Sequence, residues 1–488
     1  MFLLFNLDLH IDMFKRISLL ILLFTATLAN AQDGPWTLQK TIQYALENNI
    51  DIKQNVLNER LAALQLQQSK LSQLPNASIN TDVGRSYGRS VDPTTNLFIN
   101  QGYSFFGLNG NVDVLLFGWF QKRSTIAQNN LLNKAATADL DQLKDDVSLN
   151  VATAFLRILM TKEQITIQEG QLLYSNKQKD QTKSFVESGR SPDLDLAQME
   201  AQVATDSSAY YTAIANYQQA ILDMKAIMNF DIAAPFDVIA PQVEDLPLNE
   251  ISSVNPEDVY LSAQNHFGSV KSSQLKLDAA KKGLDVNKGA LYPQLSATGQ
   301  FGTNYASTLK ELTSANITGS QPNGDFISVN NQVVPVLTPT YDYLTRTTPF
   351  GSQFSNNFRH TYALTLSVPL FNGWNTRTAI SRSKIDIASK NYALESTKLK
   401  LKQDVYKAYY DAKVSVQKYY ASKKADEASE RAYNYAQQRY ELGLMNAVEL
   451  LTTQNNSLKA KSEALSAKYD MVFKLKVIDY YLGKEIKL

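Results

Sequence analysis

The chain lacks several residue types and motifs on which protein chemistry usually depends. None of its 488 residues is cysteine, which excludes disulfides, thiolate metal ligands and a cysteine nucleophile. Its three histidines, His10, His266 and His360, lie far apart in the sequence, which argues against a histidine-based metal site. No Gly-x-Ser-x-Gly elbow, HExxH helix or glycine-rich phosphate loop occurs. We therefore expect no enzyme activity, no cofactor and no bound metal.

Neither sign of charge is in excess, and one continuous hydrophobic run occurs near the start of the sequence. The 48 basic and 47 acidic residues give no indication of a nucleic-acid partner. Two basic residues precede the apolar run ISLLILLFTATLA, and the small-x-small triplet Ala29-Asn30-Ala31 follows it. The run is short for a membrane anchor, which is the alternative interpretation. We predict a signal peptide over residues 1–31 and favour Met13 as its start.

The rest of the chain contains the same sequence pattern twice. When the sequence is aligned with itself at one fixed offset, Pro75 aligns with Pro293 and Gly84 aligns with Gly302. This alignment needs no gap between residues 37 and 84. Further along, ESGRSPDLDL faces ELGLMNAVEL. Such internal similarity predicts two structural repeats. We place the first repeat at 32–229, a Pro- and Asp-rich linker at 230–254, and the second repeat at 255–488.

Each repeat is expected to form a helix, two strands, a very long helix, a break and another helix. In the first repeat these are helix 38–74, strands 77–87 and 105–117, helix 120–188 and a helix ending near 229. In the second they are helix 256–291, strands 294–305 and 361–371, and helices 376–442 and 446–482.

The long helices predict side-by-side packing. A run of 69 residues would extend ~100 Å, and apolar residues along it recur at coiled-coil spacing. Gly189 and Gly443 interrupt the two long runs in the same way. A glycine at a helix end supplies the left-handed conformation that lets the chain turn back, so we predict two helical hairpins.

The strands alternate in a manner that favours lipid on one face. In YALTLSVPL, residues such as Tyr362, Leu364 and Leu366 share one face, and small or polar residues take the other. Aromatic residues cluster at the strand ends, as in the girdles of membrane barrels. Four strands cannot close into a barrel. An open sheet edge in hydrocarbon costs several kcal/mol for each unpaired backbone N–H or C=O group. Several chains must therefore share one barrel.

Four segments carry a resemblance to a known family. SVPLFNGWNTR and VLLFGWFQKR are similar to its strand-to-helix signature, and RYELGLMNAVELLTTQ and VESGRSPDLDLAQ to its hairpin tips. With the duplication and the leader, the chain resembles a TolC-type outer-membrane efflux protein (outer membrane factor family). The resemblance implies a mixed fold, a twelve-stranded membrane β-barrel plus a long α-helical coiled-coil barrel, built by a homotrimer with four strands per chain.

The same resemblance implies a function and partners. The protein would be the passive exit duct of a tripartite efflux pump or type I secretion system. It would lie in outer-membrane lipid, with its helical tunnel in the periplasm. Its partners would be a periplasmic adaptor (membrane fusion protein) and an inner-membrane transporter. The alternative is a periplasmic coiled-coil adaptor or scaffold without a membrane barrel, which explains the helices but not four aromatic-ended strands.

The resemblance also assigns residues. The periplasmic gate falls on Asp195, Glu449 and Tyr440, although each acid could equally be a solvated residue favourable to a helix N-terminus. Met445 and Thr452 stand where the family has arginine and aspartate. Residues at the hairpin tips that could contact the adaptor are Gly189, Arg190, Gly443, Leu444 and Met445. The strand-to-helix transitions fall on Gly118, Pro369 and Gly373. Segment 306–360 is expected as an external loop that plugs the mouth, binds something outside or is mobile.

Overall fold

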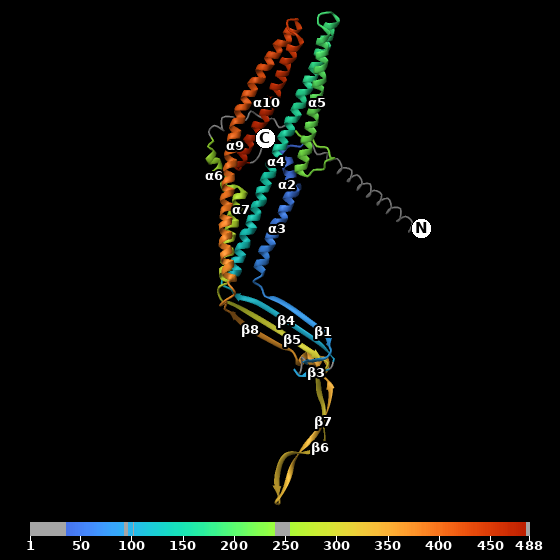
Figure 1. The fold of residues 1–488 in the computed structure, drawn as a ribbon, viewed down its shortest axis with the longest axis vertical. Coiled ribbons are helices and arrows are strands. Elements are labelled where there is room, and N and C mark those ends of the chain that lie inside the picture. Colours follow the sequence, from blue (N-terminus) through green and yellow to red (C-terminus); the bar gives the residue numbers. More distant parts are fainter. Residues whose placement is uncertain (1–35, 92–95, 101, 240–253, 485–488) are drawn as a thin grey trace, which may run out of the picture. The chain divides into compact units, whose positions relative to one another are not determined.

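A computed structural model describes residues 36–91, 96–100, 102–239 and 254–484 (Figure 1). The predicted signal peptide and most of the predicted linker lie outside these residues. The chain divides into two compact units. Of the described residues, the helical unit comprises 36–61, 134–239, 254–275 and 392–484, and the strand unit comprises 62–91, 96–100, 102–133 and 276–391. Within the described ranges, no helix combines the length and apolarity needed to cross a membrane.

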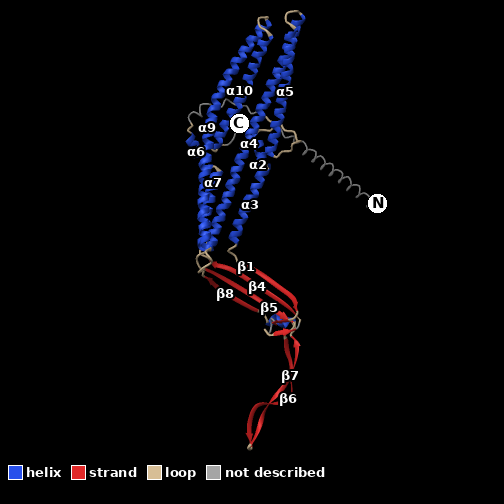
Figure 2. Cartoon of the chain, in the orientation of Figure 1, coloured by secondary structure: helices blue, strands red, loops and turns tan. Residues whose placement is uncertain are grey.

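Long helices make up most of both repeats, and Figure 2 colours the helices blue and the strands red. The two longest are α4 (Gln121–Glu187) and α9 (Asn375–Glu441), each of 67 residues, close to the predicted bounds. Each is followed by a shorter helix, α5 (Asp193–Met228) or α10 (Ala447–Tyr481). The first helical segment of each repeat forms α2 (Leu38–Asn48) and α3 (Ile50–Leu71), or α6 (Pro256–His266) and α7 (Gly268–Gly289).

The prediction of one unbroken helix over 38–74 is wrong, because Asn49 interrupts it. Asn49 has an extended ψ of 129° and its side chain accepts a hydrogen bond from Ile52 N, which caps α3. The same side chain donates to Ile227 O at 2.8 Å, and Ile50 N donates to Asn229 Oδ1 at 2.8 Å. These bonds tie the break to the end of α5, so a distant contact overrides the local helical pattern.

The prediction of one helix over 256–291 is wrong for a matching reason. Phe267, which aligns with Asn49 on the repeat offset, has a ψ of 124° and separates α6 from α7. Its ring packs against Tyr480 and Tyr481 near the end of α10, with ring centroids 5.2 and 5.5 Å apart. Both repeats therefore break their first helix where it meets the end of the repeat's last helix.

The core of the helical unit lies where α2, α4, α5 and α10 meet. Phe155 and Ile158 of α4 and Met224 and Met228 of α5 are fully enclosed there. The ring of Trp36 closes this core, packed edge-on against Tyr44 and Phe230. The apolar coiled-coil stripe of the sequence is therefore the surface that the helices bury.

The strand unit contains a four-stranded antiparallel sheet in the order β1-β4-β5-β8. Its strands are β1 (Asn76–Ser86), β4 (Tyr103–Phe117), β5 (Gln294–Ala306) and β8 (Arg359–Ser367). The first repeat supplies β1 and β4, the second supplies β5 and β8, and β4 pairs with β5 at the centre. The strand predicted to reach residue 371 ends at Ser367, because Pro369 cannot donate a ladder hydrogen bond.

The register gives the sheet one apolar and one polar face. Directly paired residues share a face, and Val114, Ala297 and Leu364 form one such row. The next row, on the opposite face, contains Asp113 and Thr298, and Thr298 Oγ1 donates to Asp113 Oδ1 at 2.9 Å. The two edge strands, β1 and β8, each pair on one side only.

The segment expected as a loop over 306–360 is largely regular. It forms β6 (Lys310–Val329), β7 (Gln332–Thr347) and the short helix α8 (Phe350–Asn356). A tight turn at Asn330 and Asn331, both with positive φ, joins the two strands as in a type I′ hairpin. A smaller antiparallel pair consists of β2 (Arg89–Val91) and β3 (Phe98–Asn100).

Candidate gate at the helical hairpin tips

The turn between α4 and α5 is a glycine-based helix end. Gly189 has a φ of +73°, which side-chain-bearing residues rarely adopt, and no atom lies within 4 Å of where its Cβ would be. Arg190 N donates to Phe185 O at 2.7 Å, completing the pattern of a Schellman motif. The Arg190 guanidinium then lies 4.6 Å from the centre of the Phe185 ring. Backbone conformation, not crowding, therefore requires glycine here.

The turn between α9 and α10 repeats this geometry. Gly443 has a φ of +71°, and Leu444 N donates to Arg439 O at 2.8 Å. A side-chain N-cap then starts α10: Glu449 N donates to Asn446 Oδ1 at 2.9 Å, and Asn446 Nδ2 donates to Glu449 Oε1 at 2.8 Å. Glu449 thus stabilises the helix start while it stays exposed.

Tyr440 joins the two hairpins. It is only 4% exposed, and its hydroxyl forms a 2.8 Å hydrogen bond with Thr182 of α4. Burial raises the pKa of Tyr440, and the charge of Asp195 acts in the same direction, so the phenol stays neutral. Around it, apolar residues from all four helices form what we call the tip cluster. Its members are Met199, Ala436, Tyr440, Ala447 and Leu450, with Phe185, Tyr433, Met445 and Leu451 packed against them.

The other predicted gate and contact residues divide between packing and exposure. Met445, which stands where the family has arginine, is half-buried against the tip cluster. Thr452 Oγ1 donates to Val448 O at 2.8 Å within α10. Asp195 lies half-buried in the first turn of α5, where a negative charge favours the helix dipole. Leu444 is exposed at its turn.

The tips are apolar as well as acidic, which the sequence did not predict. Leu194, Leu442 and Val448 are exposed close to the two turns, together with Leu444. Four exposed aliphatic side chains at two adjoining turns are typical of a surface that meets another protein. Their spacing beside Gly189 and Gly443 was visible in the sequence, but exposure could not be read from it.

A buried polar network lies away from the tips, and the sequence did not predict it either. Asp206 of α5 is 2% exposed and accepts hydrogen bonds from Gln171 at 3.2 Å, from Gln202 at 2.8 Å and from Ser175. Gln454 of α10 donates to Ser175 Oγ at 3.1 Å. The network therefore connects α4, α5 and α10 through polar bonds where the heptad pattern would otherwise place apolar contacts.

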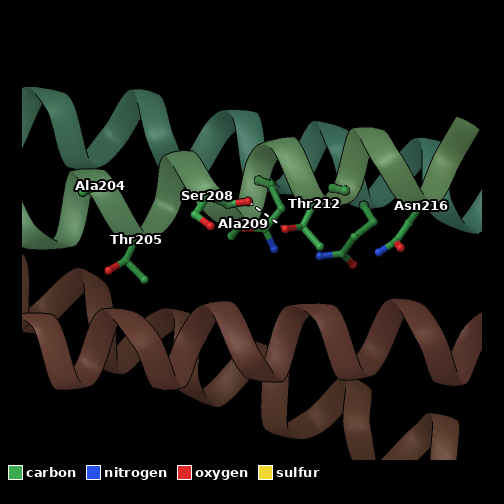
Figure 3. A pocket seen from close by; sticks show the side chains of 9 residues that line it. Ala204, Thr205, Ser208, Ala209, Thr212 and Asn216 are labelled. Carbon is green, nitrogen blue, oxygen red and sulfur yellow. Dashed lines mark hydrogen bonds between the residues drawn. The ribbon is translucent and has the colours of Figure 1, made fainter.

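Beside this network lies a groove of about 820 Å³, whose lining side chains are shown in Figure 3. Gln164 and Gln168 of α4 contribute to it, and α5 contributes the remaining residues. These are Ala204, Thr205, Ser208, Ala209, Thr212, Ala213 and Asn216. None of them is ionisable or aromatic, so this lining offers no acid, base or nucleophilic pair for catalysis.

In the strand unit, both strand-to-helix transitions place an aromatic residue in the left-handed region. After β4, Gly118 is followed by Trp119 and Phe120, with φ values of 44° and 61°. After β8, Gly373 and Trp374 have φ values of 61° and 64°. Both transitions therefore contain two successive residues with positive φ, one of which is a tryptophan.

One family model matches most of the chain. The model of the family described as "Outer membrane efflux protein" matches residues 41–229 and 260–484. The chain belongs to this family. Its members are channel proteins rather than enzymes, and the chain is an outer-membrane exit duct for efflux. The alternative of a periplasmic adaptor without a barrel is not favoured.

Solved structures share the fold at low sequence identity. The open-state MtrE outer membrane channel of Neisseria gonorrhoeae is 21% identical, with a TM-score of 0.68 over 92% of this chain and 89% of that one. The CmeC channel of Campylobacter jejuni is 17% identical, with a TM-score of 0.71 over 91% of this chain and 85% of that one. VceC of Vibrio cholerae is 12% identical, with a TM-score of 0.71 over 92% of this chain and 97% of that one. Among curated proteins, no sequence matches the chain.

Proposed function

We propose that three copies of this chain close one twelve-stranded barrel in the outer membrane, and that their helices build a tunnel in the periplasm. The observation that carries this proposal is the open four-stranded sheet with one apolar face. In hydrocarbon, the unpaired backbone groups of β1 and β8 would each cost several kcal/mol. Pairing β8 of one copy with β1 of the next removes that cost. The number three comes from the family resemblance.

The proposed assembly has the architecture of a passive duct. Residues 1–31 direct export, and the repeats at 32–229 and 255–488, joined by the linker 230–254, each contribute two strands and one long hairpin. Such a duct would serve a tripartite efflux pump or a type I secretion system. The periplasmic adaptor would meet the exposed tip residues, such as Leu194 and Leu444, and the inner-membrane transporter would supply the energy.

The mass of the intact oligomer in detergent tests the proposed assembly. We expect three chains per particle after extraction from outer membranes, and no extraction without detergent. Native mass spectrometry of the detergent-solubilised protein measures the number of chains directly. A stable monomer in detergent-free buffer would contradict both the barrel and the duct.

The gate assignment makes a separate prediction about ions. Threefold symmetry would bring three copies of Asp195 and three of Glu449 near one axis, and a carboxylate ring attracts cations. Asp195→Asn combined with Glu449→Gln should lower the cation-to-anion permeability ratio severalfold in single-channel recordings. Glutamine is preferred to alanine at the second position, because its amide oxygen can still accept the hydrogen bond from Asn446 Nδ2.

The matched control removes the same charge from the same two turns. Asp193→Asn combined with Glu441→Gln changes exposed carboxylates that the gate assignment leaves out. We expect a smaller change in the permeability ratio for this control. Equal ratios for the two double variants would show that the selectivity does not come from Asp195 and Glu449.

A further inference from the structure

The hairpin of β6 and β7, which we call the ribbon, is a long two-stranded element with no supporting layer. Its strands pair from Lys310 and Thr347 to Val329 and Gln332. Among the described helices and strands, none packs along either of its strands (Figure 1). A two-stranded ribbon alone is at best marginally stable in water, because it buries little apolar surface. A further surface packed against the ribbon would therefore stabilise it.

One face of the ribbon is apolar along its length. Directly paired residues share a face, and the register places Ile317 opposite Tyr341 and Phe326 opposite Pro335 on this side. Ile317 and Phe326 are 67% and 64% exposed. The rings of Tyr341 and Tyr343 stack with centroids 6.0 Å apart. The pairs on this face are Leu312/Thr345, Ala315/Tyr343, Ile317/Tyr341, Ser320/Pro339, Pro322/Leu337, Phe326/Pro335 and Ser328/Val333.

The opposite face is polar over most of its length. The charged residues paired along the ribbon beyond its first pair lie on this side, where Glu311 forms an ion pair with Arg346 at 2.5 Å and Asn316 faces Asp342. Toward the turn this face also becomes apolar, at Ile327 opposite Val334. The apolar face has no charged residue among its pairs from Leu312 to Ser328. Identical apolar faces could therefore meet without electrostatic repulsion.

The base of the ribbon is fixed to the sheet. Gln353 of α8 is buried, its Nε2 donates to Ala306 O at 3.0 Å and to Thr348 O at 2.9 Å, and its Oε1 accepts from Ala306 N at 3.0 Å. Asn357 Nδ2 also donates to Asn304 O at 2.7 Å. The ribbon therefore starts at a defined place, where β5 ends beside the edge strand β8.

The dimensions of the proposed barrel bring copies of the ribbon within reach of one another. Twelve strands would give a barrel about 25 Å across, from the usual strand spacing and tilt. The paired part of the ribbon is about 50 Å long at the usual rise per residue. Three ribbons that begin on the rim of such a barrel can meet, and each begins next to the edge strand through which the proposed trimer forms.

We propose that the three ribbons of the trimer pack their apolar faces against one another beyond the barrel. The partner that covers each ribbon is thus a second copy of this chain. The inference rests on the proposed trimer. It assigns segment 310–347 as an interface between copies rather than a mobile loop or a receptor for another protein.

Cysteine cross-linking tests the ribbon interface without background, because the chain has no cysteine. Tyr341→Cys places a thiol on the apolar face, and Asp342→Cys places one on the polar face one residue away. Both positions are exposed in the single chain, so neither substitution disturbs a core. With a short trifunctional maleimide, we expect covalently linked chains from Tyr341→Cys at least fivefold more than from Asp342→Cys.

The mass of the same detergent-solubilised particles separates the two proposals. Trimers in which Tyr341→Cys cross-links no more than Asp342→Cys would overturn the ribbon interface and leave the duct intact. Monomers by mass would overturn both. Tyr341→Cys cross-linked in whole cells to a different protein, with no link between copies, would overturn the ribbon interface in favour of a foreign partner.

Discussion

Leu364→Arg is expected to remove most of the assembled protein from the outer membrane. Leu364 lies near the middle of the edge strand β8, on the apolar face, and is 71% exposed in the single chain. An arginine on the lipid face of a barrel costs about 2–4 kcal/mol near the bilayer midplane. Three copies would carry this cost at once. Each 1.4 kcal/mol is about tenfold in an equilibrium constant, so even one copy shifts insertion by at least tenfold.

The neighbouring residue provides the control for this substitution. Thr365 pairs with Ser296 on the polar face, which would line a wet interior. Thr365→Arg introduces the same side chain into the same strand, and we expect near-normal amounts in the outer membrane. Quantitative immunoblots of outer-membrane fractions measure both variants. Equal loss, or equal retention, would mean that the two faces of the sheet do not meet different environments.

Tyr440→Ala is expected to leave the channel leaky. Truncating a buried aromatic side chain typically costs about 3–5 kcal/mol, because it leaves a cavity. It also leaves the buried Thr182 hydroxyl without this partner, which costs about 1–3 kcal/mol more. Since the tip cluster joins the α4–α5 hairpin to the α9–α10 hairpin, its loss should let the two tips separate.

Two further variants calibrate this result. Tyr440→Phe keeps the ring and loses only the bond to Thr182, so we expect a small effect of about 1 kcal/mol. Tyr435→Ala truncates a tyrosine that is 65% exposed on the same helix and should behave as wild type. Single-channel conductance should rise severalfold only for Tyr440→Ala. Wild-type conductance in that variant would show that the tip cluster does not hold the gate closed.

Strong local signals explain what the sequence predicted well. The heptad pattern and the glycines Gly189 and Gly443 located α4 and α9 to within about one residue at each end. Alternation located the four sheet strands, since one face is apolar and the other polar. Pro369 lay inside a predicted strand, and its missing N–H explains why β8 stops earlier.

Distant contacts explain what the sequence did not predict. Asn49 ends α2 where its side chain donates to Ile227 O of α5, a residue far away in the sequence. The ribbon escaped notice because irregular pairing near Thr313, Thr318 and Asn323 interrupts its alternation. At the hairpin tips, the turn glycines were found from the pattern. The bond between Thr182 and Tyr440 was not, because it depends on how two hairpins pack.

The central pairing of β4 with β5 has a consequence for the origin of the chain. At this seam the second strand of one repeat meets the first strand of the other. In the proposed ring, β8 of one chain and β1 of the next would meet in the same sense. Every seam around the ring is then equivalent, and the assembly has approximate sixfold symmetry. A half-length ancestor with two strands would close the same ring from six subunits, and fusion of two genes would preserve it.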